Sequence, residues 1–153
     1  MLEFFLMDPN LVAPCGMNCA VCAAYLASQY QVRDKNIKTA YCTGCRPRNK
    51  QCAFIKNRCT HGLIEGKIEY CYKCRDFPCG NLQKLDKRYR ANYRTSLIEN
   101  LIYIRDEGIT AFLKSEEIKW RCHDCGETIS CHNGICYNCH SEKLTGKPQF
   151  HWD

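Results

Sequence analysis

Fifteen of the 153 residues are cysteines, and most of them lie in closely spaced groups. The groups are Cys15, Cys19 and Cys22; Cys42 and Cys45; Cys71, Cys74 and Cys79; Cys122 and Cys125; and Cys136 and Cys139. A chain this rich in cysteine is either stapled by disulfides in a secreted protein or binds metal through thiolates in a reducing compartment. This choice constrains the possible folds more than any other feature of the sequence.

The arrangement of the cysteines favours metal binding. An odd number of cysteines cannot all pair within one chain, and cysteines separated by two residues suit one metal ion better than a disulfide. The N-terminal sequence MLEFFLMDPN lacks the basic flank and cleavage site of a secretory signal. No segment approaches the roughly 20 apolar residues of a membrane-spanning helix. We therefore expect a cytoplasmic protein with reduced, metal-bound cysteines and no membrane association.

Composition divides the chain into three predicted parts. Residues 1–80 form a cysteine-rich metal-binding module with few long aliphatic runs, so metal binding is expected to be part of its folding. Residues 81–119 form an amphipathic helical segment that packs on this module, and residues 120–153 form a zinc ribbon. The predicted fold class is a small, metal-stabilised α+β or irregular fold. It combines a short N-terminal helix, a long amphipathic helix and a ribbon of β-hairpin knuckles.

The strongest secondary-structure signal is a helical stripe across residues 81–107, with Asn81 as its cap and Gly108 at its end. Its members are Leu82, Leu85, Tyr89, Tyr93, Leu97, Leu101 and Ile104. We expect its tyrosines to belong to the core rather than to form stacking platforms. A second helix is predicted over Ala111–Lys119, and another over Cys19–Gln31 with Asn18 as its cap.

The C-terminal cysteines form the sharpest motif in the chain. Cys122 and Cys125 are followed after ten residues by Cys136 and Cys139, which is close to the spacing of a zinc ribbon. We expect Zn²⁺ here, with mononuclear iron as the alternative in the same four-thiolate geometry. Four protein ligands leave no open position, so hydrolytic catalysis is not expected at this site.

Neighbouring residues leave an alternative open in the C-terminal part. Cys131 and His132 could replace a ribbon ligand or form a second partial site, and His123 and His140 lie close by in the sequence. The preferred interpretation places Cys131 on the connecting hairpin, outside every site, where its removal would be tolerated.

Ten candidate ligands remain in the N-terminal module. They are Cys15, Cys19, Cys22, Cys42, Cys45, Cys52, Cys59, Cys71, Cys74 and Cys79. Ten thiols fit two four-sulfur sites with two left over, or sites that share bridging thiolates. Local sequence groups the four cysteines of residues 42–59, and the first triplet would then be completed from residues 71–79. Zn²⁺ and a [4Fe–4S] cluster both remain open as cofactors, because three thiols within residues 15–22 suit a cluster.

Three motifs in order resemble one known family. "CGMNCAVC" begins at Cys15, "CTGCR" begins at Cys42, and "CYKCRDFPC" begins at Cys71. Together they are similar to the domain-of-unknown-function 3795 family of bacteria and archaea, over about the first 80 residues. The resemblance implies a small metal-binding module without an established activity and raises the possibility of an iron–sulfur cluster. The ribbon after Trp120 looks like an appended unit.

Charge does not identify a partner. The formal net charge is +6, but each zinc ion held by four thiolates adds about −2, so three such sites would cancel it. We expect a metal-stapled binding or adaptor module with a protein or nucleic-acid partner. The alternative is an iron–sulfur redox or electron-transfer protein that uses the N-terminal cysteines. The prediction leans away from an enzyme, because no set of residues typical of an active site stands out.

Overall fold

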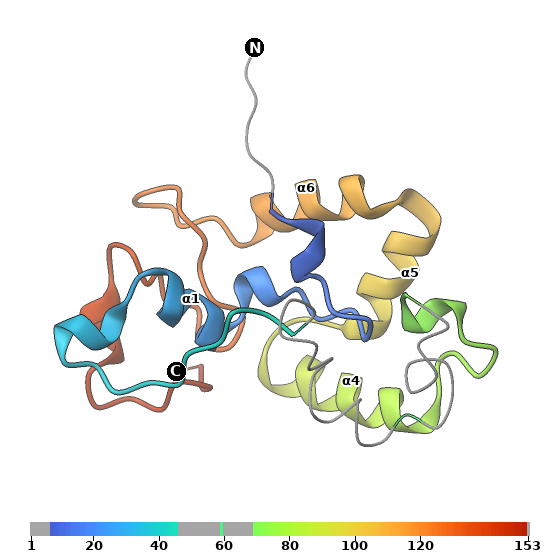
Figure 1. Cartoon of the computed structure of the whole chain (residues 1–153), viewed down its shortest axis with the longest axis horizontal. Helices are drawn as coiled ribbons and strands as arrows, with labels where there is room; N and C mark the ends of the chain where they lie inside the picture. The colour runs from blue at the N-terminus through green and yellow to red at the C-terminus, as the bar shows by residue number, and fades with distance from the viewer. Residues whose placement is uncertain (1–6, 46–58, 60–68, 153) are drawn as a thin grey trace, which may run out of the picture.

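The computed structural model describes residues 7–45, 59 and 69–152, and its regular structure there is mostly helical (Figure 1). The elements are the 3-10 turns η1 (Pro9–Leu11), η2 (Cys19–Val21), η3 (Val32–Lys35), η4 (Cys71–Lys73) and η5 (Ser141–Leu144), and the α-helices α1 (Ala23–Gln29), α4 (Gly80–Asn92), α5 (Leu97–Glu107) and α6 (Ile109–Lys119). Within these ranges, no helix combines the length and apolar composition needed to cross a membrane.

β-structure in the described residues is limited to isolated antiparallel bridges. Two of these bridges, Arg121–Thr128 and Ile129–Cys136, lie in the C-terminal segment. They stand where the sequence predicted the β-hairpins of a zinc ribbon. The segment therefore consists of tight turns joined by single bridges, within a small, cysteine-rich and mostly helical fold.

The long helix predicted over residues 81–107 is two helices, so that prediction was wrong in its continuity. Helix α4 ends at Asn92, and Arg94 has a left-handed backbone with φ of 56°. Ser96 then caps α5, since its Oγ accepts a hydrogen bond from the N–H of Glu99 at 3.1 Å. The Ser-x-x-Glu pattern at Ser96 starts a new helix, although the apolar residues keep their helical spacing on both sides of it. The prediction that Gly108 ends the helix was confirmed for α5.

Asp86 fixes the corner between α4 and α5. Its side chain is buried, and one oxygen, Oδ1, accepts hydrogen bonds from Ser96 Oγ at 2.7 Å and from the Ile98 N–H at 3.0 Å. The other oxygen accepts from Arg90 Nε at 2.8 Å. The carboxylate thus faces the N-terminus of α5, where unpaired N–H groups and the helix dipole favour a negative charge.

The predicted helix over Cys19–Gln31 is also divided. Asn18 caps the short turn η2 as expected, by accepting from the Ala20 N–H at 3.1 Å. Cys22 follows with an extended backbone, and α1 begins only at Ala23. Cys19 and Cys22 therefore lie on a turn before the helix rather than on one helical face.

The main core packs α4, α5 and α6 against the segment that precedes α1. Gly16 lies so close to α5 that an added Cβ would be 2.5 Å from the Leu97 carbonyl oxygen and 2.8 Å from Leu101 Cγ. Its φ of 92° also suits only glycine. Asn100 donates a hydrogen bond to the Gly16 carbonyl at 2.9 Å. This contact holds the first cysteines against the helices, in a core that includes Trp120.

A second, smaller core joins α1 to the C-terminal segment, which runs beside α1 in Figure 1. Leu26 and Ala27 of α1 pack in one cluster with Ile135 and Tyr137. Tyr137 is fully buried, and its hydroxyl accepts a hydrogen bond from the Asn133 side chain at 2.8 Å. The C-terminal segment is thereby fixed to the N-terminal module.

We predict that Asp86→Ala will strongly destabilise the protein. The change leaves the Ser96 hydroxyl and the Ile98 N–H without their acceptor, which should lower the free energy of unfolding by about 2–4 kcal/mol in chemical denaturation. Arg90→Ala is the matched control, since the side chain of Arg90 is 57% exposed and its ion pair should contribute less than about 1 kcal/mol. Equal losses in the two variants would contradict the assigned role of Asp86.

We predict that Glu116→Gln will stabilise the protein at neutral pH. Glu116 is buried in α6 and accepts a hydrogen bond from Asn18 at 3.2 Å, which a glutamine oxygen could also accept. Burial raises the pKa of Glu116, so the native state binds this proton more tightly than the unfolded state does.

The resulting contribution to stability is full below the unfolded pKa of about 4.3 and is lost as the pH rises above it. The gain from Glu116→Gln should therefore grow between pH 4 and pH 7, as followed by thermal unfolding. A gain that is largest at pH 4 would contradict this assignment.

Candidate metal centre

Two tight turns present the four C-terminal cysteines. In the first turn, Cys122 accepts a hydrogen bond at its carbonyl from the Gly126 N–H at 2.9 Å, and Gly126 has a φ of 82°. In the second, the carbonyl of Cys136 accepts from the His140 N–H at 3.0 Å. The Asp124 N–H also points at Cys122 Sγ, at 3.4 Å. Each turn directs two sulfurs to the same side and supplies N–H donors that stabilise thiolates.

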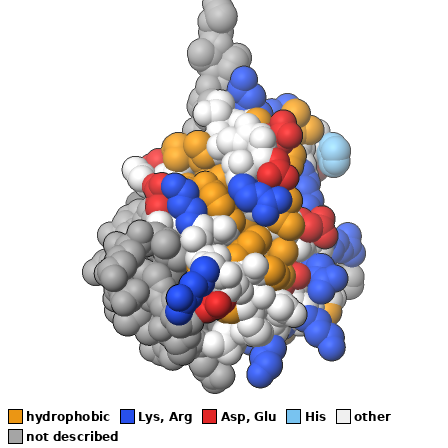
Figure 2. Space-filling model, turned by 90° about the vertical axis from the view of Figure 1, so that its right-hand side faces the viewer, with side chains coloured by type: hydrophobic (Ala, Val, Ile, Leu, Met, Phe, Trp, Pro, Cys, Tyr) orange, Lys and Arg blue, Asp and Glu red, His pale blue; other side chains and the backbone are white. Residues whose placement is uncertain are grey.

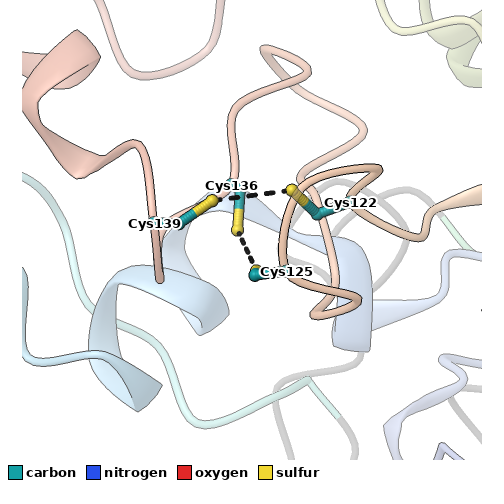
Figure 3. A group of neighbouring side chains, drawn as sticks. All are labelled: Cys122, Cys125, Cys136 and Cys139. Atoms are coloured by element: carbon teal, nitrogen blue, oxygen red, sulfur yellow. Dashed lines mark hydrogen bonds between the residues drawn. The ribbon is translucent and has the colours of Figure 1, made fainter.

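The four sulfur atoms point toward one another (Figure 3). The Cys122 and Cys139 Sγ atoms are 3.6 Å apart, and those of Cys125 and Cys136 are 3.5 Å apart. All four lie within 4.8 Å of one another. Zinc–sulfur bonds of 2.3 Å in a tetrahedron place the sulfurs about 3.8 Å apart, so the arrangement fits a single metal ion. The four-cysteine group could therefore bind a metal ion.

Neighbouring groups lower the pKa of both thiols in the first turn. Hydrogen bonds from the backbone of Cys125 and Asp124 lower the pKa of Cys122. The Asn138 side chain, followed by the backbone of Glu127, lowers the pKa of Cys125 to about 7. Burial raises the pKa of Cys136. A metal ion would thus meet two thiols that ionise readily and would have to displace protons from the second turn.

A cavity of about 330 Å³ lies beside this group. Cys122 and Cys136 form part of its wall. Its ionisable lining residues are Arg121, His123, Asp124, His140, Lys143 and Lys147. Asp124 and His140 form a close pair at its edge, with 2.5 Å between Oδ2 and Nε2. The sequence analysis noted His140 but missed Asp124, although each directly adjoins a cysteine of the motif.

The N-terminal cysteines share one core but are less closely grouped. Cys15, Cys19 and Cys71 are buried in the main core, and Cys22, Cys45, Cys59 and Cys79 pack against it. Cys42 and Cys74 are half-buried, and Cys52 lies outside the described residues. Within the described ranges, no second group of cysteines brings three ligand atoms within 4.8 Å of one another.

The neighbours of these thiols differ from the grouping expected from local sequence. Burial, and after it the nearby Cys59, Cys79 and Cys74 thiols, raise the pKa of Cys71 to about 12. Cys59 therefore lies near the cysteines of residues 71–79 rather than only near those of residues 42–45.

Cys22 has a corresponding set of neighbours in the first triplet. Burial raises its pKa to about 12, with smaller contributions from Cys19 and Cys42 in the same direction. Cys42, the first cysteine of the "CTGCR" motif, thus lies near Cys22 of the "CGMNCAVC" motif.

Cys131 lies where the C-terminal segment contacts the turn that carries Cys22. It is fully buried, its N–H donates to the Val21 carbonyl at 2.9 Å, and its carbonyl accepts from Trp152 Nε1 at 2.7 Å. The next residue, His132, accepts a hydrogen bond at Nδ1 from the Ala23 N–H at 3.1 Å. Cys131 therefore belongs to the packing between the C-terminal segment and the turn that carries Cys22.

His132 and its neighbours explain the role of the predicted core tyrosines. The ring of Tyr93 contacts His132 at 4.6 Å between centroids, and that of Tyr89 at 5.8 Å. Phe150 contacts it at 4.8 Å. Both tyrosines are half-buried, and only Tyr89 packs against the main core, so the prediction that they belong to the core holds in part. The partners Phe150 and Trp152 were missed because nothing in the local sequence of the C-terminal tail indicates where it docks.

Comparison with known proteins agrees with the N-terminal motifs. Residues 11–84 match the family described as "Protein of unknown function (DUF3795)". The match spans the cysteines from Cys15 to Cys79 and excludes the four-cysteine group of the C-terminal segment. No curated protein and no solved structure matches the chain.

We predict that Cys131→Ala will lower stability without changing metal content. The side chain fills a fully buried position, so its truncation should lower the free energy of unfolding by about 1–2 kcal/mol. This corrects the expectation that the residue is dispensable. Elemental analysis of the purified variant is the second measurement, and a lower metal content than wild type would identify Cys131 as a ligand.

Proposed function

We propose that this protein is a metal-stapled binding module whose C-terminal segment is organised by Zn²⁺ bound to Cys122, Cys125, Cys136 and Cys139. The observation that carries the proposal is the convergence of four sulfurs within 4.8 Å. Four protein ligands complete the tetrahedron of zinc and leave no position for a substrate. The ion would then stabilise the fold, and the surface around it would make the functional contacts.

The sulfur spacing supports a mononuclear ion in this segment. Distances of 3.5 and 3.6 Å between paired sulfurs suit one ion, whereas a [4Fe–4S] cube holds its thiolates at separate iron atoms and hence farther apart. Mononuclear iron would use the same four thiolates. We propose zinc because closed four-cysteine sites in small turns are typical of structural zinc.

For the N-terminal module, we propose a metal centre of Zn²⁺ or [4Fe–4S] type. Cys15, Cys19 and Cys71 share one buried core, which would shield a centre from solvent. The looser grouping of the described thiols leaves room for a centre larger than one ion. This supports the second candidate function, an iron–sulfur protein that transfers electrons or senses redox state. Iron and acid-labile sulfide in protein purified without oxygen would support it, and colourless, zinc-only protein would exclude it.

The partner in the first proposal is a protein or a nucleic acid. Some of the basic side chains that could contact such a partner are already engaged by other residues of the chain. Arg90 of α4 pairs with Asp86, and the guanidinium of Arg94, at the corner after α4, lies 3.9 Å from the centre of the Trp152 ring. Figure 2 shows one face on which basic side chains are interspersed with acidic ones and border a band of apolar side chains. The basic residues of segment 46–58 lie outside the described residues. In its described residues, this face lacks the continuous basic stripe that is typical of nucleic-acid binding, and we therefore propose a protein partner.

Binding to mixed RNA and DNA at several salt concentrations tests the partner class. Phosphate contacts release counterions, so a nucleic-acid partner requires affinity that falls steeply with added salt. We expect no such binding, and a steep salt dependence would overturn the preference for a protein partner.

We predict that metal removal will unfold the C-terminal segment. Chelation, or Cys136→Ser, should redden and alter the intrinsic fluorescence, because both tryptophans of the chain, Trp120 and Trp152, pack next to this segment. Thermal unfolding should shift to lower temperature by many degrees, since a structural zinc site contributes folding free energy directly. Re-addition of Zn²⁺ should restore wild-type protein but not the variant. Unchanged fluorescence after complete metal removal would contradict the proposal.

A further inference from the structure

Two further side chains of metal-binding type, Asp124 and His140, lie directly beside the four-cysteine group. Asp124 precedes Cys125 in the first turn, and His140 follows Cys139 in the second. One ligand atom from each of Cys122, Asp124, Cys139 and His140 lies within 4.8 Å of every other. This second set meets the same distance limit as the four-cysteine group itself.

The two sets of four ligands share one edge. The Cys122 and Cys139 sulfurs, 3.6 Å apart, belong to both sets. On one side of this edge lie the other two sulfurs, and the second set adds a carboxylate and an imidazole. A thiolate has more than one lone pair, so each shared sulfur can bind two ions at once. An ion bound by each set would give two tetrahedra that share this edge.

We propose that the protein binds a second divalent ion, Zn²⁺ or a borderline ion of similar size, through Cys122, Asp124, Cys139 and His140. The two thiolates bridge this ion to the one in the four-cysteine centre. The proposal rests on the proposed function, because the first ion holds the bridging sulfurs deprotonated and in place. Sulfur, imidazole nitrogen and carboxylate oxygen are all ligands that zinc accepts.

Charge supports a second cation at this edge. Four thiolates around one divalent ion leave two negative charges uncompensated, and the Asp124 carboxylate adds a third. Arg121, Lys143 and Lys147 in the cavity wall could offset these charges instead. In that alternative, Asp124 and His140 form only an ion pair. The two arrangements differ in the number of ions bound, which can be measured.

The histidine is oriented for this role. Its Nε2 atom faces Asp124, and its Nδ1 atom is 3.8 Å from Glu142 Oε2. A metal-bound histidine usually donates its second ring N–H to a carboxylate, a carbonyl or water, and Glu142 would take this place after a small movement of its side chain. An ion with bonds of about 2.0–2.1 Å requires its ligand atoms to be about 3.3–3.4 Å apart. Nε2 and Oδ2 would therefore separate by roughly 1 Å, a shift that side-chain rotation at the edge of the cavity can provide.

Exposure makes the second ion the exchangeable one. The two ligands that only the second site uses are both accessible, with Asp124 68% and His140 31% exposed, whereas of the two that only the first site uses Cys125 is exposed but Cys136 is buried. A ligand that solvent can reach is readily replaced by water or by another molecule in the cavity. The pair of ions would thus combine a fixed structural ion with one that can be lost, gained or shared with a bound partner.

The test compares the zinc content of full-length variants after equilibration with Zn²⁺ and removal of unbound ions. Asp124→Asn and His140→Ala should each contain one zinc ion per chain fewer than wild type, with the fluorescence of the folded protein retained. His123→Ala is the matched control, because His123 lies in the same turn and lines the same cavity but belongs to neither ligand set. It should retain the wild-type zinc content.

Equal zinc content in wild type and Asp124→Asn would overturn the second site. Asparagine keeps the shape of the aspartate side chain, so this variant decides the test even if His140→Ala does not fold. Substitution with Co²⁺ adds a test of bridging. Two Co²⁺ ions joined by thiolates couple magnetically, so the paramagnetic resonance signal per ion should be weaker in wild type than in Asp124→Asn; the same signal per ion would exclude bridging. Cys136→Ser separates the two proposals, since a wild-type zinc content there would refute the four-cysteine centre itself.

Discussion

Mutual repulsion between neighbouring thiolates is the constraint on which the C-terminal half of the structure depends. Four sulfurs within 4.8 Å cannot all carry a negative charge unless a cation lies between them. The same four residues fix two turns whose backbones otherwise pair only through single bridges. From those turns, Ile135 and Tyr137 reach the α1 helix and form the second core. A bound ion would thus stabilise both the local turns and the contact between the C-terminal segment and α1.

The contact between the C-terminal segment and the N-terminal module joins a part of the chain that matches the family to a part that does not. The segment matched by the family, residues 11–84, supplies the turn that carries Cys22, and residues beyond it supply Cys131 and Trp152. Gly16 meanwhile holds the first cysteines against α5. The cysteine-rich module therefore packs on both the helices and the C-terminal segment.

The accuracy of the sequence predictions depended on the range of the interaction involved. Gly108 as a helix end and the helix over residues 111–119 were confirmed, and Asn18 caps the turn η2 rather than the predicted helix, because each of these features is decided within one helical turn. The continuous helix over residues 81–107 was wrong, since its apolar period continues through the corner at Arg94 and Ser96. The capping pattern at Ser96 was visible in the sequence, but the acceptor that secures the corner, Asp86, is ten residues away.

By itself, the sequence determined the chemistry of the chain: which residues can bind metal, how the C-terminal four are spaced, and which segments are helical. Spacing suffices for this because two cysteines separated by two residues can face one ion from a single turn. Tertiary structure alone decided which separate groups meet. It placed the two C-terminal turns face to face, set Asp124 beside His140, and buried Cys131 against the turn of Cys22. These contacts depend on how buried apolar surfaces pack between distant segments, and no local pattern of residues encodes that packing.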